Sequence, residues 1–392
     1  MTGRIRIDEN LYTAIHKCTR CGQCTYGNGE AGFEELCPLQ MKGRFFTYSA
    51  GGLMQVARAL YEGKIPFSES IRDLVYLCTT CGACEVNCGV IGDQVDIFTI
   101  IKGGLRENGV PLMEAHRVVE ENMLKSKAPY GGRLAGRNAW LSKDLRKSLS
   151  PRSEVFYYVG CVSSYRETEI SSAFAGILST LGISFTVSDE EWCCGAPLYF
   201  SGNEEGARDY ARHNVGAIEE SGASTVVITC PTCSLMFKKY YPRWLKGALD
   251  FQVLHVTEYL EGLMEEGVLK LGSLQEEMRV SFHDPCHLGR GQGVYDAPRK
   301  ILAEIGGLEM AEARRSKQNS LCCGGGGLLT TGFPDHADFL ANQRVMEMKD
   351  TGADLILSAC PACKENLKIA ARKTRPRKRV LDLVELVGRV LV

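Results

Sequence analysis

The chain lacks the sequence features that mark membrane-spanning, secreted and nucleic-acid-binding proteins. No apolar run approaches the ~18 residues that cross a bilayer, which argues against a direct membrane span. The first ten residues are polar and charged, so we expect no secretory leader and a cytoplasmic location. The 46 basic and 47 acidic side chains leave a net charge of −1, without the basic excess that binding to nucleic acid requires.

Cysteine is abundant instead, and the 18 cysteines divide into two groups of four and two groups of five. The groups of four lie near the N-terminus: Cys18, Cys21, Cys24 and Cys37, then Cys78, Cys81, Cys84 and Cys88. Each group of five contains a lone cysteine, an adjacent pair and a CxxC: Cys161, Cys193, Cys194, Cys230 and Cys233, then Cys286, Cys322, Cys323, Cys360 and Cys363. Near neighbours in sequence rarely form disulfides without strain, so in a reducing compartment this spacing indicates metal binding or redox chemistry.

The 392 residues, 44% of them apolar, suffice for several folded domains with buried cores. The N-terminal part carries both groups of four and helical stretches at 44–62 and 91–109. A segment rich in Gly, Pro, Arg and Ser follows, which is typical of a linker, and the remainder divides into two similar halves. The predicted boundaries are 1–125 for the N-terminal domain, 126–153 for the linker, 154–270 for the first half and 271–392 for the second half.

The two halves repeat each other in spacing and in pattern. The cysteines of the first half recur about 130 residues later, and VLHVTEYL at 253–260 resembles VLDLVELV at 380–387. Short apolar strands alternate with helical stretches, which favours Rossmann-like α/β domains with parallel sheets and with cysteines just past the carboxyl ends of strands. The expected strands are 155–159, 183–187, 225–229, 280–282 and 355–357, and the expected helices are 170–181, 204–220, 297–305 and 335–350.

The groups of four have the spacing of cubic iron–sulfur clusters. A CxxCxxC run places three thiolates around one corner of a cluster, and in two-cluster ferredoxins the fourth cysteine comes from the other run. We therefore expect a helical, ferredoxin-like domain with two cubic [4Fe-4S] clusters close enough to pass electrons. The expected ligands are Cys18, Cys21, Cys24 and Cys88 for one cluster, and Cys78, Cys81, Cys84 and Cys37 for the other. The pattern departs from the compact motif at Gly89, where proline is usual, and zinc in Cys₄ sites is the alternative.

The groups of five need a different explanation, because five thiolates exceed the ligands of one cubic cluster. Adjacent cysteines reach neighbouring irons only where the backbone turns sharply, and Gly195 and the glycine run 324–327 supply that freedom. Pro231 and Pro361 fix the backbone inside the CxxC motifs. A zinc ion or a disulfide in each half stays open, although five is an odd number for pairing.

Three titratable residues flank the lone cysteine of the second half: His283, Asp284 and His287. Histidine titrates near neutral pH, so these residues are candidates for catalytic proton delivery. The alternative is that they pack around the metal site and hydrogen-bond to its sulfur atoms or to the backbone. In the linker, Arg133 and Arg137 are candidates for contact with an anionic substrate.

Several motifs resemble those of the heterodisulfide reductase family. They are CCG at 193–195 and 322–324, CPTC at 230–233, CPAC at 360–363 and HDPCHLGR at 283–290. LCTTCGACEVNC at 77–88 is similar to the small ferredoxin-like subunit of the same enzyme. The presence of both parts in one chain resembles the D-type catalytic subunit, and only the linker is poorly matched.

The resemblance implies a non-cubane [4Fe-4S] cluster held by all five cysteines of each half, with the two clusters facing each other across a cleft. The implied reaction is reduction of a small-molecule disulfide of coenzyme M and coenzyme B. The implied partner is an electron-donating redox subunit, either a membrane cytochrome b type or a flavoprotein, and the membrane type would place the chain peripherally at the membrane. A second hypothesis is an electron-carrying subunit, as in lactate, glycolate and glycerol-3-phosphate dehydrogenase complexes that pass electrons toward quinone. The completeness of both groups of five favours disulfide chemistry.

Overall fold

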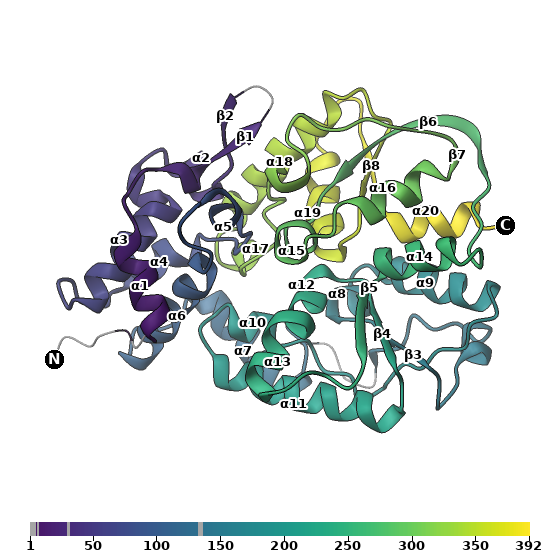
Figure 1. Ribbon diagram of the computed structural model, residues 1–392, viewed down its shortest axis with the longest axis horizontal. Coiled ribbons are helices and arrows are strands. Elements are labelled where there is room, and N and C mark those ends of the chain that lie inside the picture. Colours follow the sequence, from purple (N-terminus) through teal and green to yellow (C-terminus); the bar gives the residue numbers. More distant parts are fainter. Residues whose placement is uncertain (1–4, 6–7, 30–31, 132–135) are drawn as a thin grey trace.

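The N-terminal part of the chain folds as a helical domain with a short hairpin. The computed structural model describes residues 5, 8–29, 32–131 and 136–392 (Figure 1). The elements are α1 (Glu9–Lys17), β1 (Tyr26–Gly29), β2 (Gly32–Glu35), α2 (Pro38–Gly43), α3 (Ala50–Tyr61), α4 (Glu69–Tyr76), α5 (Ala83–Asn87), α6 (Gln94–Glu107) and α7 (Glu114–Ser126). The predicted helix 44–62 starts too early, because Arg44 takes a left-handed backbone (φ 54°) that ends α2. The Ser49 side chain then caps α3 by accepting a hydrogen bond from the amide of Gly52.

The first half contains a three-stranded parallel sheet in the order β3-β4-β5. Its elements are β3 (Val155–Tyr158), α8 (Cys161–Tyr165), α9 (Thr168–Thr180), α10 (Ala196–Tyr199), α11 (Glu204–Ser221), β4 (Thr225–Ile228), α12 (Pro231–Leu235), α13 (Tyr241–Leu245), β5 (Gln252–His255) and α14 (Val256–Glu265). Strand β3 is buried along its whole length, as expected for a parallel sheet covered by helices. The expected strand 183–187 is wrong, because Phe185 and Thr186 form only isolated bridges to Leu149 and Phe156.

The second half contains a four-stranded parallel sheet in the order β7-β6-β8-β9. Its elements are β6 (Ser273–His283), α15 (Cys286–Gln292), α16 (Asp296–Ala303), β7 (Gly306–Met310), α17 (Leu329–Gly332), α18 (Pro334–Lys349), β8 (Leu355–Ser358), α19 (Pro361–Ala371), β9 (Arg379–Asp382) and α20 (Leu383–Val390). His283 pairs with Ser358 at the carboxyl ends of the central strands. Cys286 and Cys360, which follow these two strands, therefore lie at the same edge of the sheet.

The two halves exchange their last helices (Figure 1). Helix α14, which ends the first half, packs against α16 of the second half, and α20, which ends the second half, packs against α9 of the first half. Phe174 of α9, Leu260 of α14 and Leu386 of α20 belong to one continuous hydrophobic core. The helices that follow the CxxC motifs also contact the opposite half. Helix α12 of the first half contacts α15 of the second half, and α19 of the second half contacts α8 of the first half. The two sheets and their cysteines are thus held at one shared interface.

The N-terminal domain packs on both halves. The buried Lys102 ammonium donates a hydrogen bond to the carbonyl of Phe200 (2.9 Å), and the Tyr76 hydroxyl donates to the carbonyl of Ser201 (2.8 Å). The linker segment also packs onto the protein, since Trp140 is buried. The helical N-terminal domain and the two parallel α/β halves confirm the predicted fold class, while the predicted boundaries stay predictions. Among the residues described, no helix is both long enough and apolar enough to cross a membrane.

Candidate functional site

The eight cysteines of the N-terminal domain surround two cavities. Cys18, Cys21, Cys24 and Cys88 line the first, and Cys37, Cys78, Cys81 and Cys84 line the second. Each cavity thus combines three cysteines of one run with one cysteine of the other, which is the crosswise grouping expected from the spacing. Gly22 (φ 81°) and Gly82 (φ 69°) take left-handed backbone angles between successive cysteines, where the chain must turn back toward the cavity.

The chemistry of these cavities suits metal ions. Burial raises the pKa of the Cys24 and Cys78 thiols to about 12. Buried thiols of this kind give up their protons when a cation takes the protons' place. The cysteines are free rather than paired as disulfides, and Cys21 is exposed whereas Cys81 is buried. The first cavity therefore opens toward the surface, and the second lies inside the protein.

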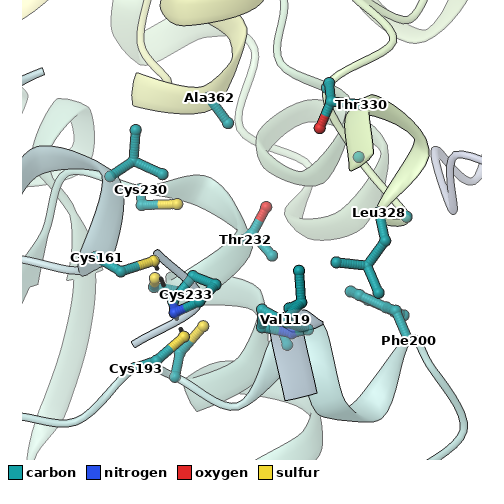
Figure 2. Close-up of a pocket in the computed structure, with 18 of the residues that line it drawn as sticks. Val119, Cys161, Cys193, Phe200, Cys230, Thr232, Cys233, Leu328, Thr330 and Ala362 are labelled. Atoms are coloured by element: carbon teal, nitrogen blue, oxygen red, sulfur yellow. Dashed lines mark hydrogen bonds between the residues drawn. The ribbon is translucent and has the colours of Figure 1, made fainter. Parts of the chain in front are cut away.

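The five cysteines of the first half line one cavity between the two halves: Cys161, Cys193, Cys194, Cys230 and Cys233. Figure 2 shows the labelled sulfur atoms turned toward the same space, with Leu328, Thr330 and Ala362 of the second half opposite. The sulfur atoms of Cys161 and Cys193 lie 3.9 Å apart. Helices α8 and α12 begin at or next to the cysteines that follow β3 and β4, so parallel strand ends bring these thiols together.

The five cysteines of the second half form a second cluster. The sulfur atoms of Cys323 and Cys363 lie 3.2 Å apart, and Cys286 lies close enough to Cys322 for the two thiols to interact. This cluster also touches both other kinds of site. Cys322 lies close enough to Cys81 in the N-terminal domain for the two thiols to interact, and Cys360 lies close enough to Cys230 in the first half. The four cysteine groups are therefore contiguous.

In each half, a glycine directly after the adjacent cysteines lets the backbone turn. Gly195 and Gly324 both have φ of 81°, the left-handed region that other residues avoid. A Cβ atom on Gly324 would lie 2.7 Å from the carbonyl oxygen of Ala337 in α18, so the turn also packs tightly on the next helix. Glycine at this position sets both the direction of the thiols and the position of the helix.

A buried ion pair shapes the backbone ahead of Cys161. Arg137 is fully buried and binds the carboxylate of Glu191, which also accepts hydrogen bonds from the amides of Val159 and Gly160 (2.9 Å each). Arg137 does not line the cavity between the halves, so the expected contact with a substrate is not made. Arg133 lies outside the described residues.

His287 joins all three parts of the chain. Its Nε2 lies 2.9 Å from the carbonyl oxygen of Thr80, which can only accept, so Nε2 carries the proton. Its Nδ1 then accepts from the hydroxyl of Thr232, 2.9 Å away. Thr80 lies between two cysteines of the N-terminal domain and Thr232 between those of the CPTC motif. His287 lines the cavity, with both ring nitrogens held.

The other two flanking residues face away from this cavity. Asp284 is buried and accepts two hydrogen bonds from Arg299 (2.7 and 3.0 Å) and one from the amide of Lys317 (2.8 Å). His283 is buried beside the second cluster, where one ring nitrogen lies within 4.8 Å of the sulfur atoms of Cys323 and Cys363. Burial is the main cause that holds the pKa of His283 well below its usual range. His283 therefore belongs to the surroundings of the second group of five.

Arg290 was missed by the sequence reasoning. Its Nε donates to the carbonyl of Cys81 (2.8 Å), and its Nη1 donates to the carbonyls of Ser320 (2.8 Å) and Gln318 (3.0 Å). The guanidinium thus lies at the contact between the N-terminal domain and the second half. Only its place one helical turn after Cys286 could have indicated that it faces the cluster.

These sites define a multi-centre iron–sulfur oxidoreductase. Residues 14–90 match the 4Fe-4S dicluster domain, and residues 155–238 and 280–368 each match the cysteine-rich domain called CCG. The chain is 33% identical to the D-type subunit of the dihydromethanophenazine:CoB–CoM heterodisulfide reductase of Methanosarcina barkeri, over 98% of this chain and 97% of the relative. The chain belongs to this family of D-type heterodisulfide reductase proteins, as the resemblance of its motifs predicted.

Two more distant relatives show how widely the layout is used. One subunit of the fumarate reductase (CoM/CoB) of Methanothermobacter marburgensis is 31% identical over 81% of this chain and 62% of the relative. The EtfAB:quinone oxidoreductase of Syntrophomonas wolfei is 25% identical over 96% of this chain and 58% of the relative. The same domains thus occur in proteins named for different electron acceptors.

Proposed function

We propose that this protein is the catalytic component of a heterodisulfide reductase that reduces a disulfide of the coenzyme M–coenzyme B type to two thiols. One observation carries the proposal, namely that the four cysteine groups form an unbroken series. The series starts at the exposed Cys21, passes from Cys81 to Cys322 and from Cys360 to Cys230, and ends at the cavity between the halves. Such a series suits delivery of electrons from the surface to a buried substrate.

The donor sets support particular clusters. Each group of four fits a cubic [4Fe-4S] cluster, because four free thiols surround one cavity. Each group of five fits a non-cubane [4Fe-4S] cluster, because the adjacent cysteines offer one more thiol than a cubic cluster takes. When bound, the clusters supply one-electron carriers and iron atoms that can coordinate thiolate sulfur. The protein residues hold these groups in sequence and keep water from the inner ones.

The cavity wall suits a flexible aliphatic disulfide. Val119, Phe200 and Leu328 give it an apolar surface, and Thr232 and Thr330 add hydroxyl groups. Mostly apolar walls with a few polar groups are typical of small-molecule sites. A disulfide held there would lie against the cysteines of the first half.

We propose positioning roles for the residues that flank Cys286. The Nε2–H of His287 holds the Thr80 carbonyl and its Nδ1 holds the Thr232 hydroxyl, so His287 fixes the cavity wall. Asp284 anchors Arg299 and the backbone at Lys317. The protons for the product thiols would then come through the cavity, where Thr330 offers a hydroxyl group.

The partner would be an electron-donating redox subunit that binds where Cys21 is exposed. A membrane protein of the cytochrome b type or a flavoprotein meets this requirement, and the former would hold the chain at the membrane surface. The relatives named as subunits support an assembly of several chains.

Anaerobic turnover tests the proposal. The purified protein is mixed with a reduced viologen dye and the coenzyme M–coenzyme B disulfide, and dye oxidation and thiol release are measured. We expect two thiols for every two dye molecules oxidised, with about sixteen irons per chain if four four-iron clusters are present. A Cys194→Ser protein is the control, and it should release no thiols. A metal content of about four zinc ions per chain would contradict every redox interpretation.

The electron-carrier function is the second candidate, and the relative named for quinone supports it. In that case the protein would contain its full amount of iron, but addition of the disulfide would not oxidise the reduced dye. Reoxidation of the dye by a quinone in the presence of the partner protein would then identify a carrier.

A further inference from the structure

The two halves carry the same cysteines in different electrostatic surroundings. The residue four positions after the lone cysteine is Arg290 in the second half and Tyr165 in the first. The residue three positions before the lone cysteine is His283 in the second half and Tyr158 in the first. At both positions the second half has a nitrogen-bearing donor where the first half has a phenol.

Arg290 brings a positive charge that has no acidic partner. Its hydrogen-bond acceptors are backbone carbonyls, and within the described residues no carboxylate forms an ion pair with it. The sulfur atoms of Cys81, Cys286 and Cys322 lie close enough to interact with its charge, as does the phenol of Tyr295. In the first half, by contrast, the buried Arg137 is neutralised by Glu191.

His283 brings a second hydrogen-bond donor. Its Nδ1 accepts a hydrogen bond from Nε of Arg344 at 3.1 Å. Arg344 is itself fixed by the carbonyl of Arg315 and the carboxylate of Glu347, both at 2.8 Å. Arginine only donates, so Nδ1 of the neutral ring carries the lone pair and Nε2 carries the proton. This Nε2 is buried and has no hydrogen-bond partner among the described residues, so its proton is available to a cluster at the adjoining second site, where one nitrogen of the ring lies within 4.8 Å of the Cys323 and Cys363 sulfurs.

Tyr158 occupies the matching place without supplying a donor. Its phenol group lies close enough to interact with Cys194 and Cys233, the counterparts of the cysteines near His283. Its hydroxyl, however, donates to the carbonyl of Trp192 at 2.7 Å. Among residues 5, 8–29, 32–131 and 136–392, the first site therefore has no counterpart of the unpaired charge of Arg290 or of the buried donor of His283.

We infer that the second five-cysteine site has the higher reduction potential and receives electrons first, because Arg290 and the Nε2–H of His283 stabilise its more negative, reduced state. This inference rests on the proposed function, in which both sites hold iron–sulfur clusters. Net charge and hydrogen bonds to sulfur are among the main factors that set cluster potentials. The interaction of Cys322 with Cys81 also links the same site directly to the N-terminal domain.

A redox titration followed by electron paramagnetic resonance tests the order of reduction. Cys194→Ser and Cys323→Ser identify which signal belongs to the first and which to the second site. In the unmodified protein we expect the second site to be reduced at the higher potential. Equal potentials, or a higher potential at the first site, would overturn the inference. Absence of iron from both sites would instead contradict the proposed function.

Variants of Arg290 test the cause. Arg290→Gln removes the charge and should shift the reduction equilibrium of the second site tenfold or more toward the oxidised state, which is about 59 mV for one electron. Arg290→Lys keeps the charge, so the reduction potential of the second site should stay close to that of the unmodified protein. Tyr165→Phe, at the matching place in the first half, should leave both potentials unchanged. Equal shifts at both sites in Arg290→Gln would overturn the role of Arg290.

His283 gives an independent test if Arg290→Gln loses iron. His283→Leu removes the donor and should lower the potential of the second site at unchanged iron content. His283→Gln keeps an N–H near the position of Nε2 and should recover the potential. Tyr158→Phe is the matched control in the first half. An unchanged second-site potential in His283→Leu would overturn the role of His283.

Discussion

Glu191 illustrates how a single residue can set a metal site that it does not touch. Its carboxylate accepts the amides of Val159 and Gly160, and these two residues lead directly into Cys161. Arg137 supplies the compensating charge from the linker. A buried carboxylate without a counter-charge is costly, so the linker segment contributes to the geometry of the first five-cysteine site.

Replacing Arg137 by Met should therefore destabilise the protein strongly. Loss of one partner from a buried ion pair costs about 3–5 kcal/mol. Denaturant unfolding of the iron-loaded protein, followed by fluorescence and by iron release, measures the change. Arg152→Met, at an exposed position, is the control and should change stability by less than about 0.5 kcal/mol. Similar stabilities of the two variants would show that Glu191 needs no counter-charge.

His116 gives the protein an acid-sensitive contact. Its Nε2 bonds the carbonyl of Leu328 at 3.2 Å, and burial lowers its pKa from 6.5 to about 4. Between these pH values the unfolded chain binds a proton that the folded protein does not, so stability falls as pH falls from 6.5 to 4. The loss attributable to His116 is roughly 3 kcal/mol.

The His116→Gln variant should show a smaller loss over the same pH range. Thermal unfolding midpoints of both proteins between about pH 4 and pH 7 measure it. Burial also lowers the pKa of His255 to about 4, so the stability of the variant should still fall with pH, but less steeply. Identical slopes would show that His116 is protonated without cost in the folded protein.

At the scale of elements, the CCG turns and the helices behind them form one unit in each half. The added Cβ would lie 3.2 Å from the carbonyl oxygen of Ala207 at Gly195, compared with 2.7 Å from that of Ala337 at Gly324. The turn of the second half is therefore the tighter of the two.

Gly324→Ala should cost more stability than Gly195→Ala. Both variants place alanine in the left-handed region, which costs about 1–2 kcal/mol, and Gly324→Ala adds a backbone clash with α18. Gly216→Ala, in the middle of α11 with open space around its Cβ, should instead stabilise by about 0.5–1 kcal/mol. Denaturant midpoints of the three variants give the ranking, and equal costs at 195 and 324 would contradict the packing argument.

The elements also show how far the sequence could predict the structure. Cysteine spacing predicted which thiols share a cavity, because three of the four cysteines at each cavity come from one CxxCxxC run with short loops such as the turn at Gly82. Strand 183–187 was predicted from its β-forming residues, but only Phe185 and Thr186 form strand-type bridges. Arg290 could not be predicted, because its contact with Cys81 depends on how the N-terminal domain packs on the second half.

At the scale of the whole molecule, the N-terminal domain is joined to the second half at its cysteines. A Cβ on Gly326 would lie 2.5 Å from the carbonyl oxygen of Thr79, and a Cβ on Gly327 would lie 2.4 Å from that of Cys78. The glycine run 324–327 thus serves the contact between domains as well as the turn. Side chains there would push the two cysteine groups apart.

Gly326→Ala should slow electron transfer between the domains without removing iron. Freeze-quenched samples after mixing with reduced dye would show rapid reduction of the N-terminal clusters and delayed reduction of the five-cysteine sites. Gly92→Ala, at an exposed position with open space around its Cβ, should behave like the unmodified protein. Unchanged transfer rates in Gly326→Ala would show that the contact tolerates a methyl group.

The exchanged helices α14 and α20 have a consequence for the origin of the molecule. Two identical chains that swap their last helices make a closed, two-fold symmetric dimer, and fusion of such a pair gives the arrangement seen here. In a homodimer every residue occurs at both equivalent positions, so Tyr165 and Arg290 would have to be the same. Fusion removes that restriction, and a symmetric ancestor could then acquire a direction for electron flow.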